Sequence, residues 1–194
     1  MKKTSGLRRC AAAWALSLSL LAPVAAEATV VVPLSRTELV AQSDVVVRAT
    51  VVDATSRWNE THTQIITLTR LHVTETLKGA NVASELVLRQ FGGEVDGLVS
   101  HVSGDARLVA GQDAVFFLRG GNGVVYLTAL AQAVYYVQAP TGGAPVAQRN
   151  LSGLTFAATS SGAAVNTFYE PAPEAAEGLA QLRASVQQAV RGGR

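Results

Sequence analysis

The residues best suited to chemistry gather in one Gly- and Asp-rich stretch, residues 92–113. Ser100 and His101 are adjacent there, and Asp105 follows four residues later. A hydroxyl, an imidazole and a carboxylate are the three groups of a serine hydrolase. The same composition is typical of a surface loop whose acidic residues cap turns. We therefore keep a hydrolase as a lesser alternative, and we expect no catalytic residues and no enzymatic activity.

A second group of residues is suited to binding. Trp58 lies between Arg57 and Asn59 at the turn that joins two long predicted strands. Trp and Arg are the residue types that most often anchor protein interfaces. A Trp that folds back over the end of the domain would explain the same pattern. The candidate binding residues are this turn and part of the loop: Arg57, Trp58, Asn59, Gly92, Gly93, Glu94 and His101.

The three histidines do not predict a metal site. His62, His72 and His101 lack the short spacing of a local ligand set, and His62 and His72 would lie about 33 Å apart along one strand. The sequence also lacks a phosphate-binding loop, a nucleophile elbow, an H-E-x-x-H motif and a dinucleotide fingerprint. We expect solvent-facing histidines, no bound metal and no cofactor.

Residues 1–26 have the pattern of a leader for export. Four cations in the first nine residues precede an apolar run at 11–22 and a small-residue exit. This order is typical of a Sec-type signal peptide, and the run is too short to span a membrane as a helix. Cleavage after Ala26 or Ala28 would leave a periplasmic or extracellular protein. We expect no membrane span in the rest of the chain.

The leader also accounts for the basic charge balance. The 194 residues include 16 Lys and Arg against 14 Asp and Glu, for a net charge of +2, and cleavage after Ala26 removes four cations and no acid. The mature chain would then carry a net charge of −2, and it would lose the only cysteine, Cys10. We expect no disulfide. A mildly acidic surface without a basic stripe disfavours nucleic-acid binding.

A mainly β domain must position these residues. Apolar alternation and turn residues predict strands at 44–56, 63–77, 85–91, 114–119, 124–130, 133–138 and 150–157. In the second strand the apolar parity changes, and a bulge near Thr69 or Arg70 would bend the sheet. The pattern predicts a small closed or partly open Greek-key barrel of the OB-like type. An open two-sheet sandwich is the main alternative.

Two helices complete the predicted domain. Ser35 and Glu38 form a capping-box pattern, which predicts a short N-terminal helix over 36–42. Apolar residues at helical spacing predict a C-terminal amphipathic helix within 173–194. The predicted organisation is a signal peptide at 1–26, a β-barrel domain at 27–157, a flexible link at 158–172 and the C-terminal helix at 173–194.

The strand pattern resembles that of a known group of proteins. Between residues 34 and 138, the segments that carry the resemblance are SDVVVRATVV, VTETLKG, LVLRQFGGEVDG, VSGDARLVAGQDAVFFL and VYLTALAQAVYYV. They are similar to uncharacterised exported bacterial proteins whose barrel resembles the netrin-like OB-fold of tissue inhibitors of metalloproteinases. The resemblance implies the scaffold and suggests a protease as partner. The zinc-chelating N-terminal Cys of those inhibitors has no counterpart here, because the mature chain would begin at Glu27 or Thr29.

These features predict an exported, non-enzymatic protein-binding module. The turn at Trp58 and the loop at 92–111 would hold an unidentified protein partner, and an extracellular protease is one partner class. The alternative is a structural or assembly component of the cell envelope, in which the C-terminal helix docks to an oligomer. The sequence leaves the partner and the oligomeric state open.

Overall fold

β-Branched residues dominate the strands that form most of this protein. The computed structural model describes residues 29–121, 124–160 and 163–193, and the predicted leader at 1–26 lies outside them. The described helices are α2 (Arg36–Gln42) and α3 (Leu179–Gly192). The strands are β1 (Thr29–Val31), β2 (Val45–Trp58), β3 (Ile65–Lys78), β4 (Glu85–Phe91), β5 (Gly93–Val95), β6 (Leu98–Ser100), β7 (Asp113–Gly121), β8 (Val124–Leu127), β9 (Val134–Gln138), β10 (Val146–Gln148), β11 (Leu154–Ser160), β12 (Ala163–Tyr169) and β13 (Glu177–Gly178).

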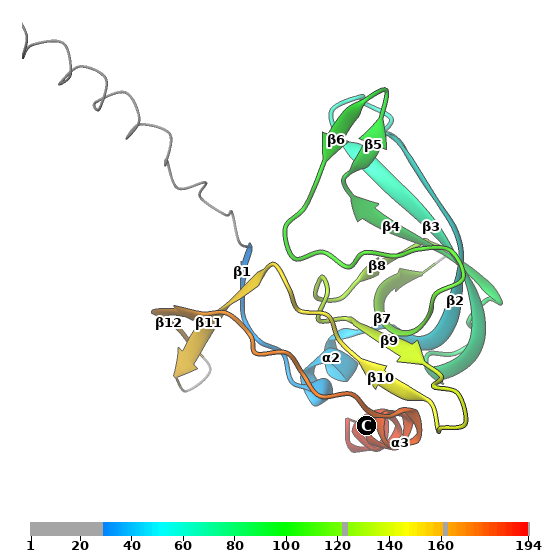
Figure 1. Ribbon diagram of the computed structural model, residues 1–194, viewed down its shortest axis with the longest axis vertical. Helices are drawn as coiled ribbons and strands as arrows, with labels where there is room; N and C mark the ends of the chain where they lie inside the picture. The colour runs from blue at the N-terminus through cyan, green and yellow to red at the C-terminus, as the bar shows by residue number, and fades with distance from the viewer. Residues whose placement is uncertain (1–28, 122–123, 161–162, 194) are drawn as a thin grey trace, which may run out of the picture.

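The main sheet has eight strands and is strongly curved (Figure 1). Its order is β13-β10-β9-β7-β2-β3-β4-β8. Strand β7 pairs with β9 over residues 114–116 and with β8 over residues 118–121. One edge of β7 is therefore divided between two neighbours, and the eight strands together do not form one closed barrel. The prediction of a mainly β protein with two helices is confirmed.

The pairing of β2 with β3 shifts register at three places. Strand β2 carries one extra residue, Val52, and β3 carries the other two, Thr74 and Leu77. A bulge bends its strand locally. We expected the bulge in β3, near Thr69 or Arg70, but β3 pairs with β4 there without a shift of register. The change in which alternate residues are apolar indicates that the two paired strands bend. It does not indicate which of the two strands carries the extra residue at that point. Because β3 alternates regularly here, Thr69 faces inward on the same side as Leu71, and both side chains are fully buried.

Apolar side chains form two core clusters on opposite faces of the main sheet. Phe116 and Phe117 are neighbours on β7 and are both fully buried, yet they belong to different clusters. Successive side chains of a strand point to opposite faces, which explains this division. The first cluster fills the concave side of the sheet. The second lies between the other face and the two helices.

Helix α3 covers the second cluster. Its buried side chains Leu179, Leu182 and Val186 pack against α2 and the outer face of the sheet. The helix begins six residues later than the predicted start at 173, because residues 177–178 pair with β10 as strand β13. The apolar face of α3 is thus buried within its own chain, and it is not available for docking to an oligomer.

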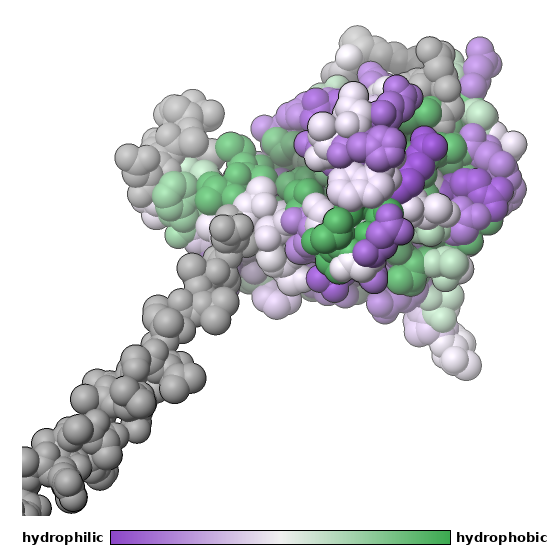
Figure 2. All heavy atoms as spheres, turned by 90° about the horizontal axis from the view of Figure 1, so that it is seen from above, coloured by the Kyte–Doolittle hydropathy of each residue, from purple (hydrophilic) through white to green (hydrophobic). Residues whose placement is uncertain are grey.

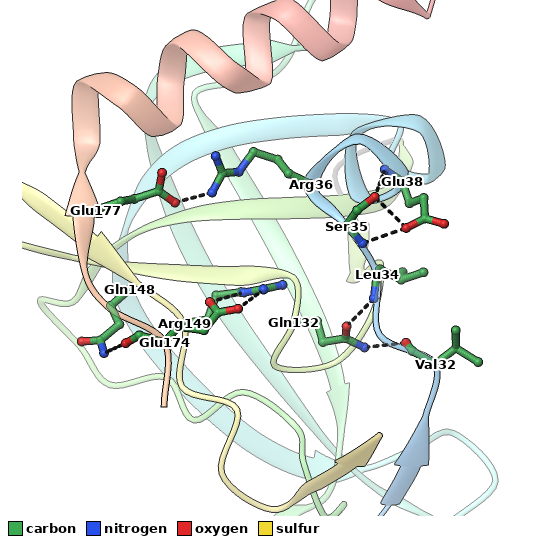
Figure 3. A network of polar contacts seen from close by, with 10 residues as sticks. All are labelled: Val32, Leu34, Ser35, Arg36, Glu38, Gln132, Gln148, Arg149, Glu174 and Glu177. Carbon is green, nitrogen blue, oxygen red and sulfur yellow. Dashed lines mark hydrogen bonds and ion pairs between the residues drawn. The ribbon is translucent and has the colours of Figure 1, made fainter. Parts of the chain in front are cut away.

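Two ion pairs fix the segment that leads into α3 (Figure 3). Arg149 binds both carboxylate oxygens of Glu174, and Arg36 pairs with Glu177. The two guanidinium groups also lie over the ring of Tyr135, with Arg149 at 5.1 Å and Arg36 at 5.4 Å from its centroid. Cation–π contacts of this geometry add to the ion pairs. The chain is therefore held in place before the helix begins.

Gln132 fixes the chain between β1 and α2 (Figure 3). Its side-chain amide is almost fully buried, accepts the N–H of Leu34 at 2.8 Å and donates to the carbonyl of Val32 at 3.2 Å. Immediately afterwards, Ser35 and Glu38 form the predicted capping box, and α2 begins at the predicted residue. A single buried amide thus sets where α2 starts relative to the sheet.

The predicted flexible link contains regular β-structure. Strands β11 and β12 pair as an antiparallel hairpin, and β1 pairs with β11 in parallel. Figure 1 shows this three-stranded sheet projecting from the body of the protein. We expected a link at 158–172, whereas the described part of 158–169 belongs to the hairpin. Its Ala, Ser and Gly residues give a weak apolar pattern, but backbone pairing with β11 does not depend on large side chains.

Candidate functional site

The loop predicted at 92–111 begins with a hairpin formed by β5 and β6. Asp96 and Gly97 form its two-residue turn, with φ of 53° and 77°. Asp-Gly is a favoured pair for such turns, so this dipeptide between apolar residues is the signal that could have predicted the hairpin. Glu94 lies on β5, is exposed, and is paired in register with Val99. Figure 1 shows the hairpin standing at one end of the molecule.

The hairpin and its flanks expose large apolar side chains. The exposed fractions are 53% for Phe91, 57% for Leu98, 74% for Val99 and 63% for Val109. We call these four residues the apolar end. Figure 2 looks onto this part of the molecule, where apolar side chains lie among polar ones. Grouped exposed apolar side chains are typical of interaction sites. Sequence reasoning selected the loop but not these side chains.

Gly92 and Gly93 serve to position the hairpin. Both have positive φ, and a Cβ on Gly93 would lie 2.2 Å from Ser56 Oγ. A Cβ on Gly92 would lie 2.7 Å from the carbonyl oxygen of Ser100. Thr67 Oγ1 donates to the carbonyl of Gly92 at 2.7 Å. The two glycines thus allow the hairpin base to lie directly against β2 and β3.

The turn at Trp58 lies at the same end of the molecule as the hairpin (Figure 1). Trp58 closes β2 and is half-buried, whereas Arg57 is exposed. The side chain of Asn59 is engaged within the turn: Oδ1 accepts the N–H of Thr63 at 2.8 Å, and Nδ2 donates to Thr63 Oγ1 at 3.0 Å. Asn59 is therefore a turn-forming residue, and Arg57 and Trp58 remain as binding candidates.

Beneath the hairpin, the inward-facing residues of the sheet change from apolar to polar. Leu71 on β3 and Leu88 on β4 face the core, but nearer the hairpin the same faces carry Thr67, Thr69 and Gln90. A cavity of about 330 Å³ opens at this point between the sheet and residues 100–109. We call it the hairpin cavity. Thr67, Thr69 and Gln90 all line this cavity.

Asp105 lines the hairpin cavity and is half-buried. Its Oδ1 accepts the N–H of Ala106 at 2.8 Å. Burial raises the pKa of the Asp105 carboxyl, while hydrogen bonds from Ala106 and Gln90 and the charge of His101 oppose that shift. A carboxylate removed from water in this way gains from a nearby cation or hydrogen-bond donor.

Tyr136 lies near Asp105 in a neighbouring cavity of about 330 Å³. Its hydroxyl donates to the carbonyl of Arg107 at 3.0 Å. Burial, together with the negative charge of Asp105, raises the pKa of Tyr136 to about 12. Tyr136 thus stays protonated at neutral pH and keeps its hydrogen bond to the loop.

Ser100, His101 and Asp105 are not arranged as a catalytic triad. His101 is exposed at the edge of the hairpin cavity, and Ser100 lies exposed at the end of β6. No hydrogen bond or ion pair joins any two of the three within the described part of the chain. Asp105 instead accepts hydrogen bonds from the N–H of Ala106 and the side chain of Gln90.

Metal-binding clusters and membrane-spanning helices are both absent from the described part of the chain. In residues 29–121, 124–160 and 163–193, no three His, Cys, Asp or Glu residues are grouped so as to hold a metal ion. His62 and His72 are exposed. Over the same ranges, no helix has both the length and the apolar character needed to cross a bilayer.

The site is thus defined by its geometry alone. No model of a protein family matches the chain, and no curated protein matches it.

Proposed function

We propose that this protein is an exported, non-enzymatic module that binds another protein through its apolar end. The observation that supports this proposal is the exposure of Phe91, Leu98, Val99 and Val109 around one hairpin. Covering apolar surface is worth roughly 25 cal/mol per Å², so a partner that covers these side chains gains affinity. Trp58 and Arg57, at the same end, are residue types that anchor such contacts.

The pairing of five strands supports an OB-like scaffold for this module. Strands β2, β3 and β4 form a meander, and β8 pairs in parallel with β4 and antiparallel with β7, which in turn pairs with β2. OB-like Greek-key barrels follow this scheme and bind ligands through loops at the rim. The resemblance to netrin-like proteins suggests an extracellular protease as the partner, and the leader pattern at 1–26 supports export.

Substitutions in the hairpin test the proposal. The tagged mature protein is used to capture partners from the culture fluid of its source organism, and each partner is then purified for titration calorimetry. We expect Val99→Asp and Leu98→Asp to weaken binding by at least about tenfold, because they place a charge in an apolar contact. Val124→Asp is the matched control, since Val124 is exposed on β8 and lies outside the apolar end. A purified partner that binds Val99→Asp and wild type equally would contradict the proposal.

A second candidate function, a component of envelope assembly, is favoured by the projecting sheet. Strands β1 and β12 are its two edges, and Val30, Phe168 and Tyr169 on them are exposed. Open edges with apolar side chains tend to pair with another chain. Light scattering across a concentration series tests this role, and a mature protein that stays monomeric would remove its support.

A further inference from the structure

We infer that the hairpin cavity binds a primary ammonium group carried on a short apolar stem, which is the chemistry of a lysine side chain on the protein partner. The identity of the lysine as the source rests on the proposed function. The chemistry of the cavity does not, because it follows from a buried hydroxyl, a half-buried carboxylate and apolar walls.

Thr69 provides the first observation. Its side chain is fully buried on the inner face of β3 and lines the cavity, yet its Oγ1 has no hydrogen-bond partner in the part of the chain that the structure describes. Buried polar groups almost always have a partner, and valine would fill the same space without that cost. The hydroxyl oxygen therefore suits a donor that enters the cavity.

Asp105 provides the second observation. Its carboxylate lines the same cavity, and an ionised carboxylate can accept more hydrogen bonds than the two that reach Asp105 from Ala106 and Gln90. Two other charged or titratable side chains line the cavity, His101 and Arg107, and both are exposed. An ammonium group has three donors and no acceptor. It therefore suits a cavity lined by a carboxylate and an unpaired hydroxyl oxygen, and a carboxylate ligand would be repelled by Asp105.

The apolar walls of the hairpin cavity provide the third observation. Ala54, Val102, Ala106 and Leu108 line the hairpin cavity, and Phe91 and Val109 belong both to it and to the apolar end. An apolar stem would therefore contact apolar side chains from the opening inward. A lysine has this construction, a flexible four-carbon stem with a compact cation at its tip. A partner seated on the apolar end is in position to insert one.

Small amines test the cavity without any partner. We propose NMR titrations of the mature protein with n-butylammonium chloride and, separately, with n-butanol, which has the same stem without the charge. The ammonium should shift the backbone signals of Thr69 and Asp105 and bind about tenfold more tightly than the alcohol, as expected for a charge-assisted hydrogen bond. Asp105→Asn should reduce its affinity about tenfold. Thr69→Val should reduce it severalfold.

Glu85→Gln is the matched control, because Glu85 is an exposed acid on β4 that does not line the cavity. This variant should bind the ammonium as wild type does. Equal affinity for alcohol and ammonium, or unchanged affinity in Asp105→Asn, would overturn the inference. These outcomes do not depend on the partner experiments with Val99→Asp, so failure of the cavity and failure of the proposed function are distinguishable.

Discussion

The two hydrogen bonds of the Gln132 side chain allow a prediction of how much the junction between β1 and α2 contributes to the free energy of unfolding. Replacing Gln132 with Leu keeps a similar volume but leaves the N–H of Leu34 and the carbonyl of Val32 without their partner. An unpaired buried polar group costs about 1–3 kcal/mol. Val32 is exposed, so water can reach its carbonyl, whereas Leu34 is half-buried. We therefore expect Gln132→Leu to lower the free energy of unfolding by about 1–3 kcal/mol, mainly through Leu34.

Gln132→Glu separates the two hydrogen bonds. The introduced carboxylate can still accept from Leu34, but it lies against the carbonyl of Val32, which repels it. Protonation gives it a donor for that carbonyl, so its pKa should be raised in the folded state. Stability gained from the protonated form is present at low pH and is lost as the pH rises through the folded pKa. The variant should therefore approach wild-type stability as the pH falls.

Urea denaturation followed by circular dichroism measures both variants, and hydrogen exchange reports on the Leu34 amide directly. Gln181→Leu is the matched control, because Gln181 is exposed on α3 and should change stability by less than about 0.5 kcal/mol. A Gln132→Leu variant that is as stable as the control, and whose Leu34 amide exchanges as slowly as in wild type, would refute this prediction.

Four further predictions concern the site and the core. Burial raises the pKa of Asp105 above its ordinary 3.8, so the folded state loses stability as the pH rises and the carboxyl group ionises. In urea denaturation, the free energy of unfolding of Asp105→Asn should therefore exceed that of wild type by a margin that grows above about pH 4. Tyr136→Phe should remove the phenol that titrates at about pH 12 in absorbance at 295 nm. Gly97→Ala should lower the free energy of unfolding by about 1–2 kcal/mol, because Gly97 has a positive φ although its Cβ would meet no other atom. Gly93→Ala should lower it further in the same assay, because its Cβ would also lie against Ser56. Leu182→Ala should lower the free energy of unfolding by about 2–5 kcal/mol, since Leu182 is fully buried.

Local signals in the sequence predicted the elements that local interactions specify. Helix α2 begins where the capping box of Ser35 and Glu38 places it, because those contacts span only three residues. Helix α3 begins later than its apolar repeat and Pro173 suggest, because Glu174 and Glu177 are engaged by Arg149 and Arg36 from distant parts of the chain. A pairing across so many residues leaves no trace in local periodicity.

The candidate site was predicted as a region and not as a set of groups. The sequence indicated the loop and the Trp58 turn, since their composition departs from that of a strand. It did not indicate Thr69, which reads as one more β-branched strand residue. Thr69 faces the same side as Leu71 because β3 pairs with β4 there without a shift of register, and residues 100–109 lie across that side. The cavity thus depends on a contact between distant parts of the chain, which local periodicity does not predict.

The position of α3 has a consequence for the order of folding. Its partner α2 lies near the start of the described chain, and the face of the sheet that carries Phe117 and Tyr135 stays uncovered until α3 arrives. During synthesis, which proceeds from the N-terminus, the growing chain exposes this face until Leu182 and Val186 have emerged. Folding thus ends in one late step, and a chain shortened before residue 179 would offer chaperones and proteases a persistent apolar surface.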